Sequence, residues 1–123
     1  MGRDPTFRLL YSLSGLQPNL TLADGTIKVM DVDLTETMKR IDNNTPNATL
    51  KDGATYKNDT HPKIKNKKGV TYTEWTVPTP GVHGRGNQRI VVGSDGSRWY
   101  TPNHYGQTKG KNGKPLGNTW RRL

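Results

Sequence analysis

The stretch YTEWTVPTPGVHGRGNQRIVVGSDGSRWYT, at residues 72–101, decides the fold. Residues 72–77 alternate, with Thr73, Trp75 and Val77 on one face and the other three residues opposite, as in a strand with one buried face. Residues 89–92, Arg89 followed by three β-branched apolar residues, predict a second strand. The SDGS segment at 94–97 is typical of a hairpin turn into a third strand at 98–101. The stretch therefore predicts an antiparallel meander.

The segment before the meander predicts a helix. Leu34, Met38 and Ile41 recur at helical spacing, and asparagines and a proline at residues 43–46 end the pattern. The DLTE segment has the form of a capping box, with Asp33 as the cap and Glu36 reaching back. Residues 26–30 alternate like a short strand. A helix followed by a meander predicts an α+β domain with the helix packed on a twisted antiparallel sheet.

In this arrangement, the apolar face of the strand at 72–77 packs on the helix. The opposite face, which carries Glu74, is expected to be polar and open to a ligand. We expect three regions along the chain: a leader or linker at 1–25, the folded domain at 26–106 and a basic tail at 107–123. The composition of the tail predicts a flexible segment or one ordered by a partner.

The charge balance indicates a polyanionic partner. The chain has 123 residues, a net charge of +9 and a pI near 10.0, so nucleic acid is the first expectation and an acidic membrane surface the second. Solubility alone is the plain alternative. With no cysteine, the chain has no disulfide or thiolate metal site. No apolar run is long enough to span a membrane, and residues 7–16 lack the features of a signal peptide.

Four side chains within about thirty residues could cleave a phosphodiester. Glu74 beside guanidinium groups stays ionised and accepts a proton, Arg85 and Arg89 match a phosphate, and His104 donates a proton near neutral pH. Each of these residues, taken alone, is more often a solvated surface group. The other two histidines are weaker candidates, and the scattered histidines do not predict a metal site.

Three blocks in this order, YTEWTV at 72–77, TPGVHGRGNQRIVVG at 79–93 and YTPNHY at 100–105, resemble the signature blocks of the bacterial guanyl-specific ribonucleases, the barnase family. The likeness runs from about residue 26 to residue 105 and is nearest to the small streptomycete branch. It implies a helix on an antiparallel sheet and metal-independent endoribonuclease activity without a cofactor. The resemblance also implies that Glu74 is the general base, that His104 is the general acid and that Arg85 and Arg89 hold the scissile phosphate. The product would be a 2′,3′-cyclic phosphate.

The resemblance implies substrate-binding residues as well. Tyr56 and Asn58 match positions for stacking and loop shaping, and Tyr105 matches one that lines the phosphate or sugar site. Where the family carries a glutamate that binds guanine, this chain has Thr60, with Asp59 beside it. A hydroxyl is a weaker acceptor than a carboxylate, so base specificity departs from the family pattern at this point.

The additions at both ends resemble those of the toxin domains at the C-termini of bacterial polymorphic toxins. This likeness implies a monomer that is secreted or delivered into a target-cell cytoplasm, with an acidic immunity protein as a partner besides RNA and no membrane partner. Two alternatives remain: a noncatalytic RNA-binding module, and a basic scaffold domain. A pure binder would require neither Glu74 nor His104, which separates it from an enzyme.

Overall fold

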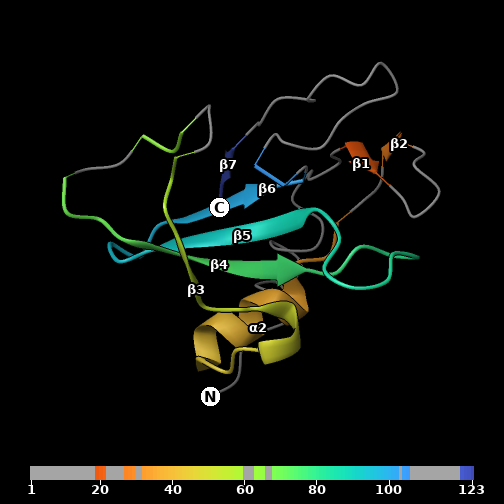
Figure 1. Ribbon diagram of the computed structural model, residues 1–123, viewed down its shortest axis with the longest axis horizontal. Coiled ribbons are helices and arrows are strands. Elements are labelled where there is room, and N and C mark those ends of the chain that lie inside the picture. The colour runs from red at the N-terminus through yellow and green to blue at the C-terminus, as the bar shows by residue number, and fades with distance from the viewer. Residues whose placement is uncertain are drawn as a thin grey trace.

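The computed structural model describes residues 19–21, 27–29, 32–59, 63–65, 68–102, 104–105 and 120–123. These residues form one α-helix, a short 3-10 helix and two antiparallel sheets, which confirms the predicted α+β fold (Figure 1). The elements are β1 (Asn19–Thr21), β2 (Ile27–Val29), α2 (Thr35–Asn43), η1 (Ala48–Leu50), β3 (Ala54–Tyr56), β4 (Tyr72–Val77), β5 (Gln88–Gly93), β6 (Arg98–Thr101) and β7 (Arg121–Arg122).

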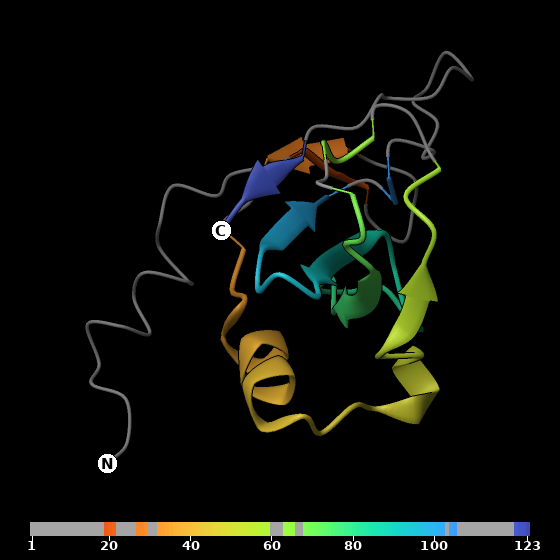
Figure 2. The same cartoon turned by 90° about the vertical axis from the view of Figure 1, so that its left-hand side faces the viewer.

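The main sheet has five strands in the order β3-β4-β5-β6-β7, each antiparallel to its neighbours. Its register places Glu74 opposite Val91 and Arg89 between Thr76 and Thr101. Helix α2 lies under one face of this twisted sheet, and the β1–β2 ribbon lies beyond the other (Figure 2). Strands β4 and β6 have the bounds that the sequence predicts, and β5 is one residue longer at each end.

The main core lies between α2 and the sheet, as predicted. Trp75 and Val77 of β4 pack with Leu34 and Met38, and Ile41 packs at the edge of this cluster. The core is completed by one residue before the helix and one from each of the next two strands: Val32, Ile90 and Tyr100. The period of two along β4 and the helical spacing of the apolar residues therefore meet at one interface.

The opposite face of the sheet is not the open polar surface that the sequence predicts. A second apolar cluster covers part of it, built from Tyr56, Ile64, Tyr72, Val91 and Tyr105. The segment after β3 folds back over the sheet and brings an isoleucine with it. The expectation was wrong here because Ile64 and Tyr105, which no periodicity marks, come from segments outside the strands and pack on the strand residues Tyr56, Tyr72 and Val91. Glu74 thus lies beside an apolar cluster, which limits the water around it.

The predicted capping box is wrong in register. Helix α2 begins at Thr35 with Leu34 at the N-cap position, where the side chain makes no capping hydrogen bond. Leu34 is fully buried in the core, so packing decides where the helix begins. The Asp33 carboxylate accepts from the Thr35 amide at 2.9 Å, and hydrogen bonding to the Thr35 side chain, followed by this amide, lowers the pKa of Asp33. The helix ends, as predicted, at Asn44, which is left-handed with φ of 50°.

A buried carboxylate joins the helix to the sheet. The Asp52 side chain is fully buried and accepts three hydrogen bonds: from Arg40 Nε at 2.8 Å, from the Asn47 amide at 3.0 Å and from the Thr76 amide at 2.9 Å. The Arg40 guanidinium also donates to the carbonyl oxygen of Thr76 at 2.8 Å. Asp52 thereby fixes the position of β4 at the residue next to Trp75.

The described C-terminal residues belong to the sheet. Strand β7 pairs with β6, with Trp99 opposite Arg122 and Tyr100 opposite Arg121, and the Leu123 amide donates to the Arg98 carbonyl at 2.9 Å. A flexible tail is therefore wrong for residues 121–123, because the free edge of β6 offers them backbone hydrogen bonds. The boundaries of the three predicted regions stay predictions.

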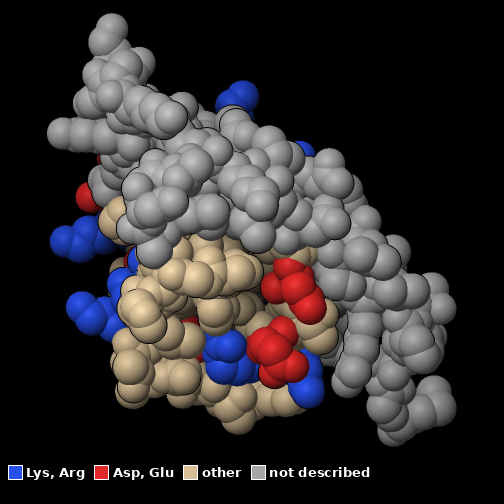
Figure 3. Space-filling view, turned by 90° about the vertical axis from the view of Figure 1, so that its right-hand side faces the viewer, with Lys and Arg blue, Asp and Glu red and all other residues tan. Residues whose placement is uncertain are grey.

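Charge is unevenly spread over the described surface. On the face shown in Figure 3, lysine and arginine side chains project along one edge, and acidic side chains lie beside basic ones further in. Among the described residues, none of the helices has the length and apolar character needed to cross a membrane. The net charge of +9 therefore does not make a uniformly positive surface.

Candidate active site

Glu74 is the centre of the candidate site. It lies in the middle of β4 on the face turned away from α2, and its side chain is 17% exposed. One carboxylate oxygen accepts from Arg85 Nη2 at 2.7 Å, and the other accepts from the Tyr105 hydroxyl at 2.8 Å. Charge-assisted hydrogen bonds of this length are among the stronger ones in proteins. Glu74 is therefore held in one orientation, with its charge opposite a guanidinium group.

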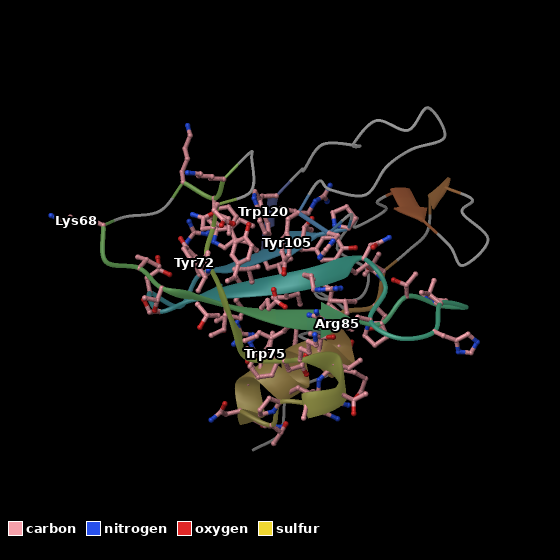
Figure 4. All side chains as sticks on the ribbon, viewed as in Figure 1. Lys68, Tyr72, Trp75, Arg85, Tyr105 and Trp120 are labelled. Atoms are coloured by element: carbon pink, nitrogen blue, oxygen red, sulfur yellow. The ribbon has the colours of Figure 1, made fainter. Side chains whose placement is uncertain are left out.

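Arg85 belongs to the loop between β4 and β5 (Figure 4), and from there its guanidinium group reaches Glu74. Its Nε donates to the Thr76 hydroxyl at 3.1 Å, so two residues of β4 hold the two sides of the guanidinium group. The loop is tight at this point. Gly86 has φ of +60°, and a Cβ atom there would lie 2.9 Å from the Thr79 hydroxyl oxygen. Since only glycine fits this position, the sequence of the loop determines where Arg85 can lie.

Arg89 lies in β5, two residues before the partner of Glu74, and is only 3% exposed. Its Nη1 donates to the carbonyl oxygens of Arg85, Gly86 and Gln88 at 3.3, 2.9 and 2.8 Å. Its buried Nε has no hydrogen-bond partner among the described residues. Burial, and then the charge of Arg85, lower the pKa of Arg89, whereas Tyr105 and Glu74 raise it. Arg89 is thus a fixed positive charge beneath the site.

His104 and Tyr105 follow β6 in a strained turn. Both are left-handed, with φ of 53° and 61°, which is uncommon for residues other than glycine. The His104 amide donates to the Asn87 carbonyl at 2.7 Å, and the Tyr105 amide donates to the Thr101 hydroxyl at 3.3 Å. These two hydrogen bonds hold the turn against the sheet. Strain of this kind persists where the surrounding structure fixes it.

The imidazole of His104 lies beside the ring of Tyr105, with 5.2 Å between the ring centres. Burial, and then the charges of Arg89 and Arg85, lower the pKa of His104, and the charge of Glu74 raises it. Burial, followed by Glu74, raises the pKa of Tyr105, so this tyrosine stays a neutral hydrogen-bond donor. The structure thus brings all four predicted catalytic side chains together around one tyrosine.

The predicted substrate-binding residues differ from one another in burial and in contacts. Tyr56 is buried against Tyr105, with 4.5 Å between their ring centres. The Asn58 amide closes the loop after β3, because it donates to the Ile64 carbonyl and accepts from the Ile64 amide, both at 2.9 Å. Asp59 is exposed, and Thr60 lies outside the described residues. Asn58 shapes the loop, and the contacts of all these residues with a substrate stay predictions.

Two contributors to the site were not predicted from the sequence. Thr76 orients Arg85 through its hydroxyl, and the only signal for it was that Thr76 and Glu74 share a face of β4. Trp120 packs against Tyr105 with 5.8 Å between the ring centres. A lone aromatic residue in a basic segment was the available signal. Within the described ranges, no group of three or more His, Asp or Glu side chains could hold a metal ion.

The site combines a carboxylate, an imidazole and two guanidinium groups, which are chemically able to transfer protons and to bind a phosphate. Comparison with known families agrees with this class, since a family described as ribonuclease matches residues 24–110. The chain belongs to this ribonuclease family and is an RNA-cleaving enzyme. No curated protein and no solved structure matches it.

Proposed function

We propose that this ribonuclease is a metal-independent endoribonuclease that cleaves RNA by transesterification. Glu74 removes the proton from a ribose 2′-hydroxyl, and the 2′-oxygen attacks the neighbouring phosphorus. The bond from phosphorus to the 5′-oxygen breaks as His104 gives its proton to that oxygen. The products are a 2′,3′-cyclic phosphate and a 5′-hydroxyl. DNA is not cleaved because it lacks the nucleophile.

The observation that carries this proposal is the contact of Glu74 and His104 with the same tyrosine. Tyr105 donates to the carboxylate at 2.8 Å, and its ring centre lies 5.2 Å from that of the imidazole. A base and an acid must lie on the two sides of one phosphorus atom for in-line displacement. The contact of both groups with one side chain supports this arrangement, in which each group would supply about 10²–10⁴-fold.

The two arginines serve the charge that grows on the phosphate oxygens. Arg85 is paired with Glu74 before RNA binds, and its side chain is 24% exposed. A phosphate that enters the site competes for this guanidinium group, which frees Glu74 to take the proton. Arg89 is buried and fixed, so it contributes a constant positive potential with no cost of reorganisation during the reaction.

Specificity and context are part of the same proposal. Guanine is the base expected from the family, and the loop with Asp59 and Thr60 in place of the glutamate weakens the preference for it. We place the chain as a monomeric toxin domain, secreted or delivered into a target-cell cytoplasm. An acidic immunity protein would then cover the basic site, for which the net charge of +9 is the supporting observation.

The test is incubation of the purified chain with total RNA in EDTA, followed by mapping of the new 3′ ends. We expect 2′,3′-cyclic phosphate ends, and we expect Glu74→Gln and His104→Ala to lower turnover at least about a hundredfold while the fold is kept. Wild-type turnover in both variants would leave a noncatalytic RNA-binding role for this surface. Activity that returned only with added metal would reject the proposed mechanism.

A further inference from the structure

Two side chains at the C-terminal end of the described chain, Trp120 and Arg122, lie on the face of the sheet that carries Glu74. Residues that pair across antiparallel strands point to the same face. Arg122 is opposite Trp99, which packs on the second cluster, and Arg121 is opposite Tyr100, which is buried in the main core. The Arg122 guanidinium lies over the indole of Trp99, 5.3 Å from the ring centre. Arg122 therefore shares the face of Glu74, and Arg121 lies on the other.

Trp120, two residues before Arg122, lies on the same face. Its ring centre is 5.8 Å from that of Tyr105 and 5.9 Å from that of Tyr56. Both tyrosines are buried, whereas Trp120 is half-buried and packs against them as the more exposed member of a three-ring cluster. Figure 4 shows Trp120 and Tyr105 on the side of the sheet away from Trp75. Tyr105 contacts both the indole of Trp120 and the carboxylate of Glu74.

We propose that Trp120 and Arg122 form a binding track for the single-stranded RNA that flanks the cleaved phosphodiester. A nucleobase would stack on the indole, and a neighbouring phosphate would bind the exposed guanidinium. A guanidinium group stacked on an aromatic ring keeps its N–H edges for a phosphate. Alternating aromatic and cationic side chains suit single-stranded nucleic acid of any sequence. The track rests on the proposed function, and it lies beyond residue 110, where the family match ends.

The test uses RNA that cannot be cleaved. Oligonucleotides with 2′-O-methyl riboses lack the nucleophile, and a dinucleotide spans only the cleaved bond whereas an octanucleotide also covers the track. Fluorescence anisotropy on the full chain gives both affinities. We expect Trp120→Ala to weaken octanucleotide binding about 5- to 150-fold, the range for loss of one stacked base, and to weaken it more than dinucleotide binding. Trp120→Phe should recover most of the loss.

Arg121 is the matched control for Arg122, since both belong to β7, are exposed and carry the same charge. We expect Arg122→Ala to weaken octanucleotide binding and to lower the salt slope by about one ion, and Arg121→Ala to do neither. Equal effects of the two substitutions would mean that β7 contributes to RNA binding only through its net charge, and the proposed track would be wrong. Tighter binding by Trp120→Ala would overturn it too, because the indole would then be a cover rather than a platform.

The measurements distinguish a failure of the proposed cleavage mechanism from a failure of the proposed binding track. Glu74→Gln weakens the pairing that competes with a phosphate for Arg85, so this variant should bind the octanucleotide at least as tightly as the wild type, and a loss of cleavage with intact binding concerns the mechanism alone. If Trp120→Ala does not fold, as judged by circular dichroism, Trp120→Phe and Arg122→Ala still decide the question. Normal octanucleotide affinity in a folded Arg122→Ala variant, together with an unchanged salt slope, excludes the track whatever the fate of the mechanism.

Discussion

Replacement of Asp52 by asparagine should destabilise the protein more than any surface substitution. The two carboxylate oxygens receive three donors, Arg40 Nε, the Asn47 amide and the Thr76 amide. An asparagine turns one oxygen into an NH₂ group, which meets a donor where it needs an acceptor. Loss of one partner from a buried ion pair costs about 3–5 kcal/mol. Because the Arg40 side chain is 19% exposed, we expect the lower end, about 3 kcal/mol.

That change is large beside a total stability of about 5–15 kcal/mol for a domain. With a urea m-value of about 1–3 kcal/mol/M, the unfolding midpoint should fall by about 1–3 M. Urea titration followed by far-UV circular dichroism measures it, with Asp59→Asn as the control, since Asp59 is an exposed aspartate after β3. A midpoint for Asp52→Asn equal to that of the control would show that the buried carboxylate does not hold α2 to β4.

Three further predictions concern the site. In an NMR titration, His104 should have a pKa below that of an ordinary histidine, and Glu74→Gln should lower this pKa further, because the Glu74 charge raises it; an upward shift would contradict the geometry. Since a general acid acts in its protonated form, the basic limb of kcat/KM should fall at correspondingly low pH. Gly86→Ala should lower the urea midpoint more than Gly84→Ala, because both glycines have positive φ but only at Gly86 does a Cβ meet the Thr79 hydroxyl; equal midpoints would argue against the close contact. Thr60→Glu should sharpen the preference for guanine in the mapped cleavage sites, and an unchanged pattern would show that this loop position does not read the base.

The strands of the sheet could be predicted because each is marked by a pattern within a short stretch of sequence. The alternation in β4 and the Asp95-Gly96 turn before β6 require no knowledge of distant contacts, and their bounds were confirmed. The helix could be predicted from its apolar stripe, but not its first residue. Asp33 is a better capping residue than Leu34, and burial of Leu34 in the core outweighs that local preference.

The candidate residues of the site could be predicted from the sequence, but the contacts that hold them in place could not. Sequence order favoured Glu74 and His104 as partners, and the structure brings both to Tyr105. The contacts that hold them depend on chain segments far apart in sequence, such as the one from Asp52 to the Thr76 amide. No periodic pattern in the sequence predicts such a contact. Trp120 was missed for the same reason, since its position follows from strand pairing with β6.

Because the ribosome makes the chain from its N-terminus, β6 emerges before its partner strand β7. While a nascent chain has left the ribosome only as far as β6, the outer edge of that strand has no partner, and unpaired edges invite association with other chains. Recombinant fragments that stop before Trp120 would keep the same open edge after release.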